Sequence, residues 1–330
     1  MRYAAPAGRA QAGAGGTMST NLQSFSLRDL EYLVAVGEHL NFGRAAQACA
    51  VSQPTLSAQV RKIEEAIGTE VFERSPRGAL VTPRGAEVLA QARIVLAEAR
   101  RLFEVAAAGG EPLAGTFRLG VVSTLGPYLV PFLMKPLRAR FPRLRLLISE
   151  GHTRALAHQL EEGELDAMLA AAPLPGADLT ALKLFREEFV LVVPRDHPLA
   201  RVERVTRADI PPADLILLSE GHCMRDQALA FCPGRLREDR PEMQAASLES
   251  LRQMVAAGVG ISFMPQLAVQ NGTLLDDLVA YRRIGKGDLA REIALFHRPG
   301  FVRIREARLL RGAVREILAG SSGVKVLGGV

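Results

Sequence analysis

Apolar and polar residues follow a helical spacing from residue 27 onward. In the segment LRDLEYLVAVGE, residues 27–38, the apolar positions that share one helical face are Leu27, Leu30, Leu33, Val34 and Val36. Asp29 and Glu31 lie in the first turn, where carboxylates favour the positive end of a helix. The pattern predicts an amphipathic helix that starts at residue 27.

Two more helical segments follow the break HLNFG. The first, RAAQACA at residues 44–50, is short, and its small side chains let another helix approach closely. The second, VSQPTLSAQVRKIEEAIG at residues 51–68, predicts a helix with Ser52 as N-cap, Pro54 in its first turn and Gly68 as its stop. Two short helices across a tight turn are typical of a helix-turn-helix, whose second helix enters the major groove of DNA.

The third segment and the stretch after it carry the candidate DNA contacts. Val60, Ile63 and Ile67 should face inward, which leaves for DNA the outward residues Gln53, Pro54, Thr55, Ser57 and Arg61. The next segment, VFERSPRGALVTPRG at residues 71–85, predicts a hairpin wing, and we expect Arg74 and Arg77 to hold phosphates. The alternative is that three amphipathic helices simply pack together.

An uninterrupted helical pattern occupies residues 83–108. The run is rich in Ala, Leu, Glu and Arg and has no interior breaker. Its apolar face is longer than one small domain can cover, so we expect a linker that also dimerises. The alternative, packing within its own subunit, stays open.

Strands and helices then alternate as a parallel α/β sheet requires. TFRLGVV at 116–122, RLRLLISEG at 143–151 and LDAMLAA at 165–171 predict strands, and the segments between them predict helices. We expect Ser123 or Thr124 to cap the helix after the first strand.

The remaining pattern predicts a regulatory domain of two lobes over residues 115–320. Lobe I should comprise about 115–188 and 293–320, and lobe II about 189–292. Ligands of such sheets bind at the carboxyl ends of the strands, where Thr124 and Thr153 follow the first two strands. Helix capping is an equally open interpretation of either threonine.

Composition narrows the class of protein. A chain of 330 residues with 48% hydrophobic residues can form two or three globular domains, and no run approaches the 18 apolar residues of a membrane span. The formal charge of +6 permits a polyanionic partner without requiring one. We expect residues 1–26, rich in Gly and Ala, to form a disordered tail, and Met18 offers a second translation start.

Two of the three cysteines lie close together, in EGHCMRDQALAFCPG at residues 220–234. So few cysteines do not form a secreted disulfide framework, and a reducing cytosol is expected. Cys223 falls at a predicted helix start beside His222 and Arg225, a setting that favours a thiolate. Two buried, inert cysteines are the alternative.

The helix and a disulfide between these cysteines exclude each other. Nine helical residues span roughly 13 Å, whereas a disulfide needs Cα atoms about 4.4 to 6.8 Å apart. A disulfide that closes this loop constrains the unfolded chain by only about 3 kcal/mol. That free energy is comparable to the stability of one local element. The segment is therefore predicted to be bistable, unravelling on oxidation.

The N-terminal segments resemble a known family. The run SQPTLSAQVRKIE, within the gap-free match from residue 27 through the long helix, is similar to the winged helix-turn-helix of the LysR-type transcriptional regulators. The resemblance implies an α/β protein with a winged helix-turn-helix at 27–85, a linker helix and a two-lobed regulatory domain like a periplasmic binding protein. It also implies a homodimer, usually assembled into a homotetramer.

The cysteine segment resembles the peroxide-sensing OxyR branch of that family, with its pattern GHC-x-RDQA-x-x-FC. STLGPYLVP, SLESLRQMVAAGVGISFMP and HRPG are similar as well, whereas the leading tail and PGRLREDRPEMQ depart from the branch. The resemblance implies that Cys223 senses and Cys232 resolves, next to a peroxide pocket of Thr124, Thr153, His222, Arg225 and Asp226.

The implied function is a cytoplasmic activator that detects hydrogen peroxide through a reversible disulfide. Its implied partners are promoter DNA, RNA polymerase, and glutaredoxin or thioredoxin for reduction, with no cofactor, metal or membrane. Three alternatives are a LysR-type regulator of a small metabolite with inert cysteines, a thiol peroxidase, and a zinc site at His222, Cys223 and Cys232. A peroxidase has no use for a winged helix, and adjacent His and Cys rarely bind one tetrahedral ion.

Overall fold

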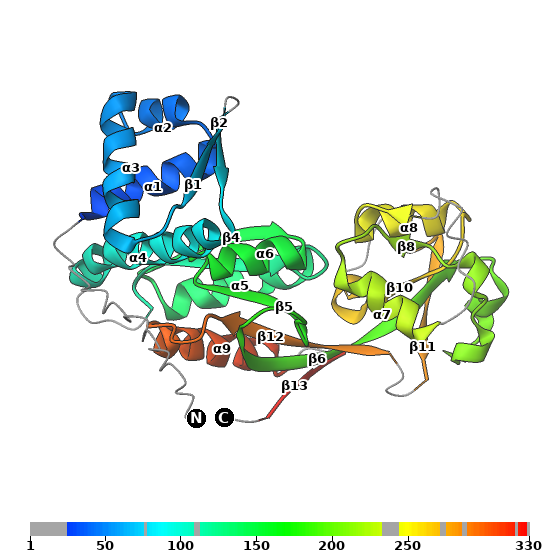
Figure 1. Ribbon diagram of the computed structural model, residues 1–330. Helices are drawn as coiled ribbons and strands as arrows, with labels where there is room; N and C mark the ends of the chain where they lie inside the picture. Colours follow the sequence, from blue (N-terminus) through cyan, green and yellow to red (C-terminus); the bar gives the residue numbers. More distant parts are fainter. Residues whose placement is uncertain are drawn as a thin grey trace, which may run out of the picture. The chain divides into compact units, whose positions relative to one another are not determined.

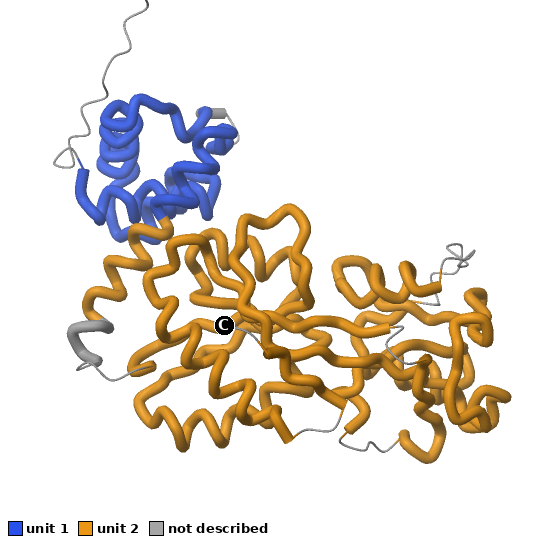
Figure 2. The backbone as a smooth tube through the Cα atoms, turned by 90° about the horizontal axis from the view of Figure 1, so that it is seen from below, with its two compact units in different colours: residues 1–92 blue, residues 93–330 orange. Residues whose placement is uncertain are grey.

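The computed structural model describes residues 25–75, 78–108, 113–232, 244–270, 275–285, 289–320 and 323–328. The chain forms two compact units, residues 1–92 and 93–330, coloured separately in Figure 2. Most of the predicted tail, residues 1–24, lies outside the described residues. In the part of the chain that the structure describes, no helix combines the length and apolarity needed to cross a membrane.

The first helix starts at residue 27, as the pattern predicted. Helix α1, Leu27–His39, is capped by Ser26, whose hydroxyl accepts the Asp29 N–H while the Asp29 carboxylate accepts the Ser26 N–H. This reciprocal pair satisfies two otherwise free backbone donors. The predicted end of the tail at residue 26 is therefore wrong, because Ser26 is part of the helix cap.

The next two helices form the predicted tight pair. Helix α2, Phe42–Ala48, starts two residues before the predicted position because the Asn41 side chain accepts the Arg44 N–H. Helix α3, Gln53–Ile67, is capped by Ser52 and ends at Gly68 with φ 66°, as predicted.

A hairpin and the long helix complete this part. Strands β1, Phe72–Ser75, and β2, Gly78–Val81, pair antiparallel, which confirms the wing. The wing lies against the end of α1: the Ala79 N–H donates to the Leu40 carbonyl at 2.9 Å, and a Cβ at Gly78 would stand 2.4 Å from that oxygen. Helix α4, Pro83–Ala108, confirms the long helix, and the unit boundary falls inside it.

The second unit is built on a mixed sheet (Figure 1). Strands β3, Gly115–Val122, β4, Leu144–Gly151, and β5, Ala167–Ala172, are parallel, as predicted. Strand β12, Ala290–His297, lies between β5 and β6, Thr180–Pro194, and is antiparallel to both. The sheet is therefore mixed, with parallel pairs at both edges, β4-β3-β5 at one and two further strands at the other, and antiparallel pairs between them.

Three helices pack on this sheet. They are α5, Gly126–Arg140, α6, Thr153–Glu161, and α9, Ile304–Leu318. The predicted cap of α5 is wrong, because Leu125 occupies the N-cap and no side chain there accepts a hydrogen bond. A turn at residues 123–125 separates the strand from the helix, so Ser123 and Thr124 lie too early to cap it.

The remaining elements surround the C-terminal half of β6. They comprise strands β7, Arg204–Val205, β8, Leu217–Leu218, β9, Gln244–Ala245, β10, Ser262–Pro265, and β11, Val279–Ile284, helices α7, Cys223–Phe231, and α8, Leu248–Ala256, and 3-10 turns at Pro198–Arg201, Arg207–Asp209, Pro212–Asp214 and Gln266–Val269. A last strand, β13, Val324–Val326, pairs with residues 185–187 of β6.

Two separate apolar clusters fill the second unit. The first collects buried residues from 113–185 and 293–318 together with Leu267, and the second collects those from 189–289. Strand β6 contributes to both, because it runs from one cluster into the other (Figure 1). The division into lobes near residue 189 stays a prediction, and these clusters support it.

Candidate functional site

Helix α7 carries one cysteine at each end. Gly221, with φ 92°, turns the chain into the helix, and Cys223 is its first residue and half-buried. Cys232 directly follows the last helical residue and is 3% exposed. Both thiols are free, and about 13 Å of helix separates them.

The two thiols contact different cores. Cys223 packs against the first cluster, whereas Cys232 belongs to the second. Burial raises the pKa of the Cys232 thiol, and the charge of Arg207 offsets only part of this effect. Cys232 is therefore less acidic than an ordinary thiol, which suits the resolving role that the family resemblance implies.

His222 is buried and pairs with a second histidine. It is 6% exposed, and its ring lies 4.4 Å from that of His152, centroid to centroid, at 72°. Burial lowers the pKa of His222, and the neighbouring His152 lowers it further. Burial and His152 therefore both oppose a positive charge on His222 beside Cys223.

Thr124 and Thr153 lie at one edge of the sheet, as predicted. Strands β3 and β4 pair Val122 with Gly151, so the two threonines follow neighbouring strand ends. Thr124 is 3% exposed, whereas Thr153 is half-buried as the first residue of α6.

A buried ion pair that the sequence analysis missed holds Thr124. Arg291 donates through Nη1 to the Thr124 hydroxyl at 3.0 Å and through Nη2 to its carbonyl at 3.1 Å. Its Nε donates to Glu187 at 2.8 Å, and both side chains are 0% exposed. The other Glu187 oxygen accepts the Leu267 N–H at 2.8 Å. Charged residues inside apolar strands were the signal available in the sequence.

The two charged pocket candidates of α7 lie in different surroundings. Arg225 donates to the Leu218 carbonyl at 3.1 Å, which ties the first turn of α7 to β8. Asp226 is exposed in the same turn. The structure thus brings the first turn of α7 against the start of α6 through the two histidine rings.

The predicted base-reading residues lie on α3. Gln53, Pro54, Thr55 and Arg61 are exposed and Ser57 is half-buried. The Thr55 hydroxyl lies 2.7 Å from that of Ser52, so it also takes part in the helix cap. Of the wing arginines, Arg77 and the side chain of Arg74 lie outside the described residues.

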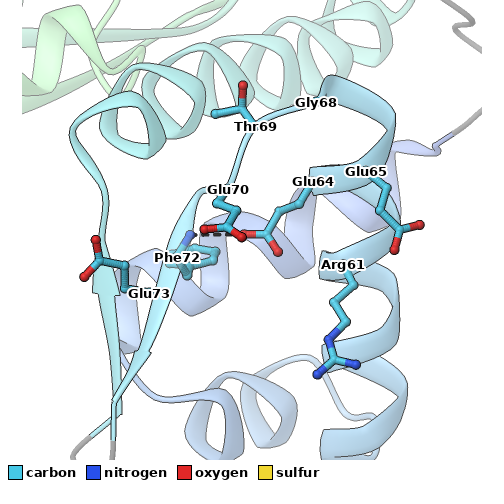
Figure 3. Close-up of a pocket in the computed structure, with 8 residues that line it drawn as sticks. All are labelled: Arg61, Glu64, Glu65, Gly68, Thr69, Glu70, Phe72 and Glu73. Atoms are coloured by element: carbon cyan, nitrogen blue, oxygen red, sulfur yellow. Dashed lines mark hydrogen bonds between the residues drawn. The ribbon is translucent and has the colours of Figure 1, made fainter.

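An acidic hollow of about 780 Å³ lies beside the end of α3 (Figure 3). Glu64 there accepts the N–H groups of Val71 and Phe72 at 2.8 and 3.0 Å, which fixes the start of the wing to α3. The lining residues are Arg61, Glu64, Glu65, Gly68, Thr69, Glu70, Phe72 and Glu73. The four carboxylates give the hollow a negative character next to Arg61.

Possible metal ligands do not gather in the described parts of the chain. Within those ranges, no group of three or more His, Cys, Asp or Glu side chains is placed to hold an ion. Zinc binding by His222, Cys223 and Cys232 would also require Cys232 to leave its buried position at the far end of α7.

Two family models match the chain. Residues 27–86 match the bacterial regulatory helix-turn-helix protein, lysR family, and residues 110–319 match the LysR substrate binding domain. Together these matches cover the winged helix and nearly all of the second unit.

Relatives and solved structures agree with these matches. A protein of Dickeya chrysanthemi named "Hydrogen peroxide-inducible genes activator" is 41% identical over 291 residues, which cover 88% of this chain and 95% of its own. A full-length OxyR variant from Pseudomonas aeruginosa superposes with a TM-score of 0.72 at 37% identity, covering 88% of this chain and 95% of its own. The oxidised form of OxyR gives a TM-score of 0.58 at 36% identity, covering 64% and 100%.

Proposed function

The chain belongs to the LysR family of bacterial transcriptional regulators, in the branch of the hydrogen peroxide-inducible genes activators, and we propose that it senses peroxide through Cys223 and Cys232. It is a DNA-binding activator that responds to hydrogen peroxide and controls oxidative-stress defence genes. The alternative of a metabolite-responsive regulator with inert cysteines is not favoured, because the similar proteins are named hydrogen peroxide-inducible genes activators.

One observation carries the assignment of the two cysteines. A single short helix holds both free thiols at its opposite ends, with one half-buried and one buried. An isolated helix of nine residues is marginal in water, so α7 depends on packing that one new bond could outweigh. This arrangement suits a switch between a helix and a disulfide-closed loop.

The proposed chemistry has two steps. The Cys223 thiolate attacks one oxygen of hydrogen peroxide, the O–O bond breaks, and a sulfenic acid and hydroxide form; the hydroxide takes up a proton to give water. The Cys232 thiolate then attacks the sulfenic sulfur, forming the disulfide and releasing a second hydroxide that is likewise protonated. The second step requires α7 to unfold, because the helix holds the two thiols too far apart.

The pocket residues have distinct proposed roles. Thr124 and Thr153 would position peroxide by hydrogen bonds, and the Arg291–Glu187 pair would fix the Thr124 hydroxyl. Arg225 would anchor the first turn of α7 through the Leu218 carbonyl. Asp226, His222 and these groups together would form the polar surroundings of the attacked peroxide.

Hydrogen exchange tests the proposed unfolding of α7. One equivalent of peroxide should remove the protection of the backbone amides of residues 226–231, while those of α8 remain protected. The Cys232→Ser chain is the matched control, since it can be oxidised at Cys223 but cannot close the disulfide. Full protection of α7 in a fully oxidised wild-type chain would contradict the proposal.

The DNA contacts are proposed to divide between base reading and phosphate binding. Exposed side chains of α3 would read bases, and the wing arginines would hold the backbone. Arg61→Ala should relax sequence preference, at about 1 to 3 kcal/mol per lost base contact. Arg77→Ala should weaken all sequences alike and flatten the salt dependence. Selection from a random DNA library measures both, and an unchanged preference in Arg61→Ala would refute its role as a base reader.

The remaining partners follow from this function. We propose that α4 joins two chains into a homodimer and that pairs form a homotetramer, whose rearrangement on oxidation changes the spacing of the DNA-binding heads. The activator would then contact RNA polymerase at the promoter in the cytoplasm, and glutaredoxin or thioredoxin would reduce the disulfide. The chain is not proposed to be an enzyme, because each peroxide consumed would require α7 to melt and refold.

A further inference from the structure

A histidine at the start of α6 covers the turn that leads into α7. His152, the N-cap residue of α6, lies with its ring 4.4 Å from that of His222. The same ring covers Gly221, where an added Cβ would stand 3.4 Å from His152 Nδ1. His152 therefore packs against both residues that precede Cys223.

The buried ring of His222 has one unused nitrogen. The ring forms a hydrogen bond with the Ala246 backbone, while Nε2 is buried and has no partner among the described residues. A neutral imidazole that donates through one nitrogen keeps the other as an acceptor. Among the described residues Nε2 forms no hydrogen bond to the Cys223 thiol, so the thiol, one residue further along the chain, must approach this acceptor before its proton can be removed.

We propose that His152 is a positioning residue for the oxidation of Cys223, because its ring holds His222 in the orientation that leaves Nε2 free to accept the thiol proton. The inference rests on the proposed peroxide function and adds a residue of α6 to it. His152 touches neither the thiol nor peroxide in this account, and it acts only through His222.

The step that His222 would serve is balanced. Nε2 takes the proton of the Cys223 thiol, and the resulting thiolate bonds to one peroxide oxygen as the O–O bond breaks. The hydroxide that leaves takes the proton back from Nε2 and becomes water. Cys223 is thereby oxidised by two electrons to a sulfenic acid, and one molecule of peroxide is reduced.

The contact between the rings also has an electrostatic consequence. Protonation of both imidazoles would place two positive charges side by side, so His152 lowers the pKa of His222. His222 therefore remains an acceptor to lower pH than it would alone. The other ionisable groups on the three adjoining segments are Glu220, Cys223, Arg225 and Asp226 around α7, Arg154, His158 and Glu161 on α6, and Glu249 and Arg252 on α8.

The test measures the rate of sulfenic acid formation at Cys223 in the full-length Cys232→Ser chain, where dimedone traps the product. His152→Ala should slow this rate by about tenfold, a small part of the gain that a positioned base provides. His152→Phe retains the ring and should stay within about twofold at pH 8. In His152→Phe the rate should begin to fall at a higher pH on acidification, because the charge of His152 no longer opposes protonation of His222.

His158→Ala provides the matched control, since His158 is an exposed histidine of the same helix and should change neither rate nor pH profile. The profile is recorded between about pH 5.5 and 8.5, where imidazoles titrate. His152→Ala reacting at the parent rate throughout would overturn the inference, as would His152→Phe that is equally slow and whose rate begins to fall at an unchanged pH. Failure of the parent Cys232→Ser chain to react at Cys223 would instead refute the proposed function, and the inference with it.

Discussion

The two ends of α7 differ in burial, in the core that they contact and in thiol chemistry. Cys223 is half-buried at the helix start, beside backbone N–H groups that have no partner within the helix. Cys232 is 3% exposed in the second apolar cluster, and burial raises the pKa of its thiol. The contrast indicates that the order of reaction is set by surroundings: the accessible thiol attacks first, and the buried one reacts once the helix opens.

The largest expected effect comes from removing each thiol in turn. Cys223→Ser should abolish the response to peroxide and leave Cys232 reduced, because the buried thiol reacts slowly. Cys232→Ser should still be oxidised, but stop at a sulfenic acid on Cys223 that dimedone labels. Mass spectrometry of both chains after peroxide measures this. Oxidation of Cys232 at the normal rate in Cys223→Ser would mean that the roles are reversed.

Loosening the packing around Cys232 should make the two thiols more alike in accessibility. Phe231 is 8% exposed and packs edge-to-face on Phe263 at 5.7 Å, next to Cys232. Phe231→Ala should cost about 3 kcal/mol of unfolding free energy and expose Cys232 to alkylation in the reduced protein. Urea unfolding and iodoacetamide labelling check the two effects. Leu229→Ala, at a half-buried position of the same helix, is the control, and unchanged Cys232 labelling in Phe231→Ala would contradict the packing account.

The raised pKa of Cys232 predicts a dependence on pH. In the reduced protein, Cys223 should be alkylated before Cys232 at neutral pH, and labelling of Cys232 should rise only above the ordinary thiol range. A raised folded-state pKa gives stability that is present below the unfolded pKa and is lost as pH increases through the folded value. The reduced chain should therefore lose stability in alkali, and Cys232→Ala should lose less. Equal labelling of both thiols at neutral pH would remove the contrast.

The smallest expected effect concerns a contact away from the cysteines. The Tyr128 hydroxyl of α5 donates to Glu249 of α8 at 2.8 Å. Burial, and to a smaller extent this hydrogen bond, raises the pKa of Tyr128 far above its usual value. Tyr128→Phe should cost about 0.5 to 1.5 kcal/mol without changing the rate of Cys223 oxidation, because that rate is controlled by α7 and the His152–His222 pair. Thermal unfolding and dimedone labelling measure both, and a strongly altered oxidation rate would contradict this local control.

The helices and the wing could be predicted because their signals are local. Ser52 and Gly68 mark the ends of α3 through backbone chemistry that a single segment contains. The start of α1 was predicted correctly, whereas that of α2 was misplaced by two residues, because the cap at Asn41 outweighed the apolar periodicity. Boundaries set by a side-chain hydrogen bond need knowledge of that bond.

The candidate site could be predicted only in part. The cysteines and the threonines could be found from their places at a helix start and at strand ends. The ion pair of Arg291 and Glu187 could not, because its members lie 104 residues apart and meet only through the pairing of β6 with β12. The lowered pKa of His222 likewise results from burial and from His152, which approaches from α6. Contacts of this kind follow from topology, and a local pattern does not encode them.

Disulfide mapping of the full-length chain tests the central claim most directly. The reduced protein is treated with one equivalent of peroxide, free thiols are alkylated, and peptides are identified by mass spectrometry without reduction. The account predicts a Cys223–Cys232 bond within one chain and an alkylated Cys49. Finding Cys223 and Cys232 both free, or a bond that includes Cys49, would contradict it.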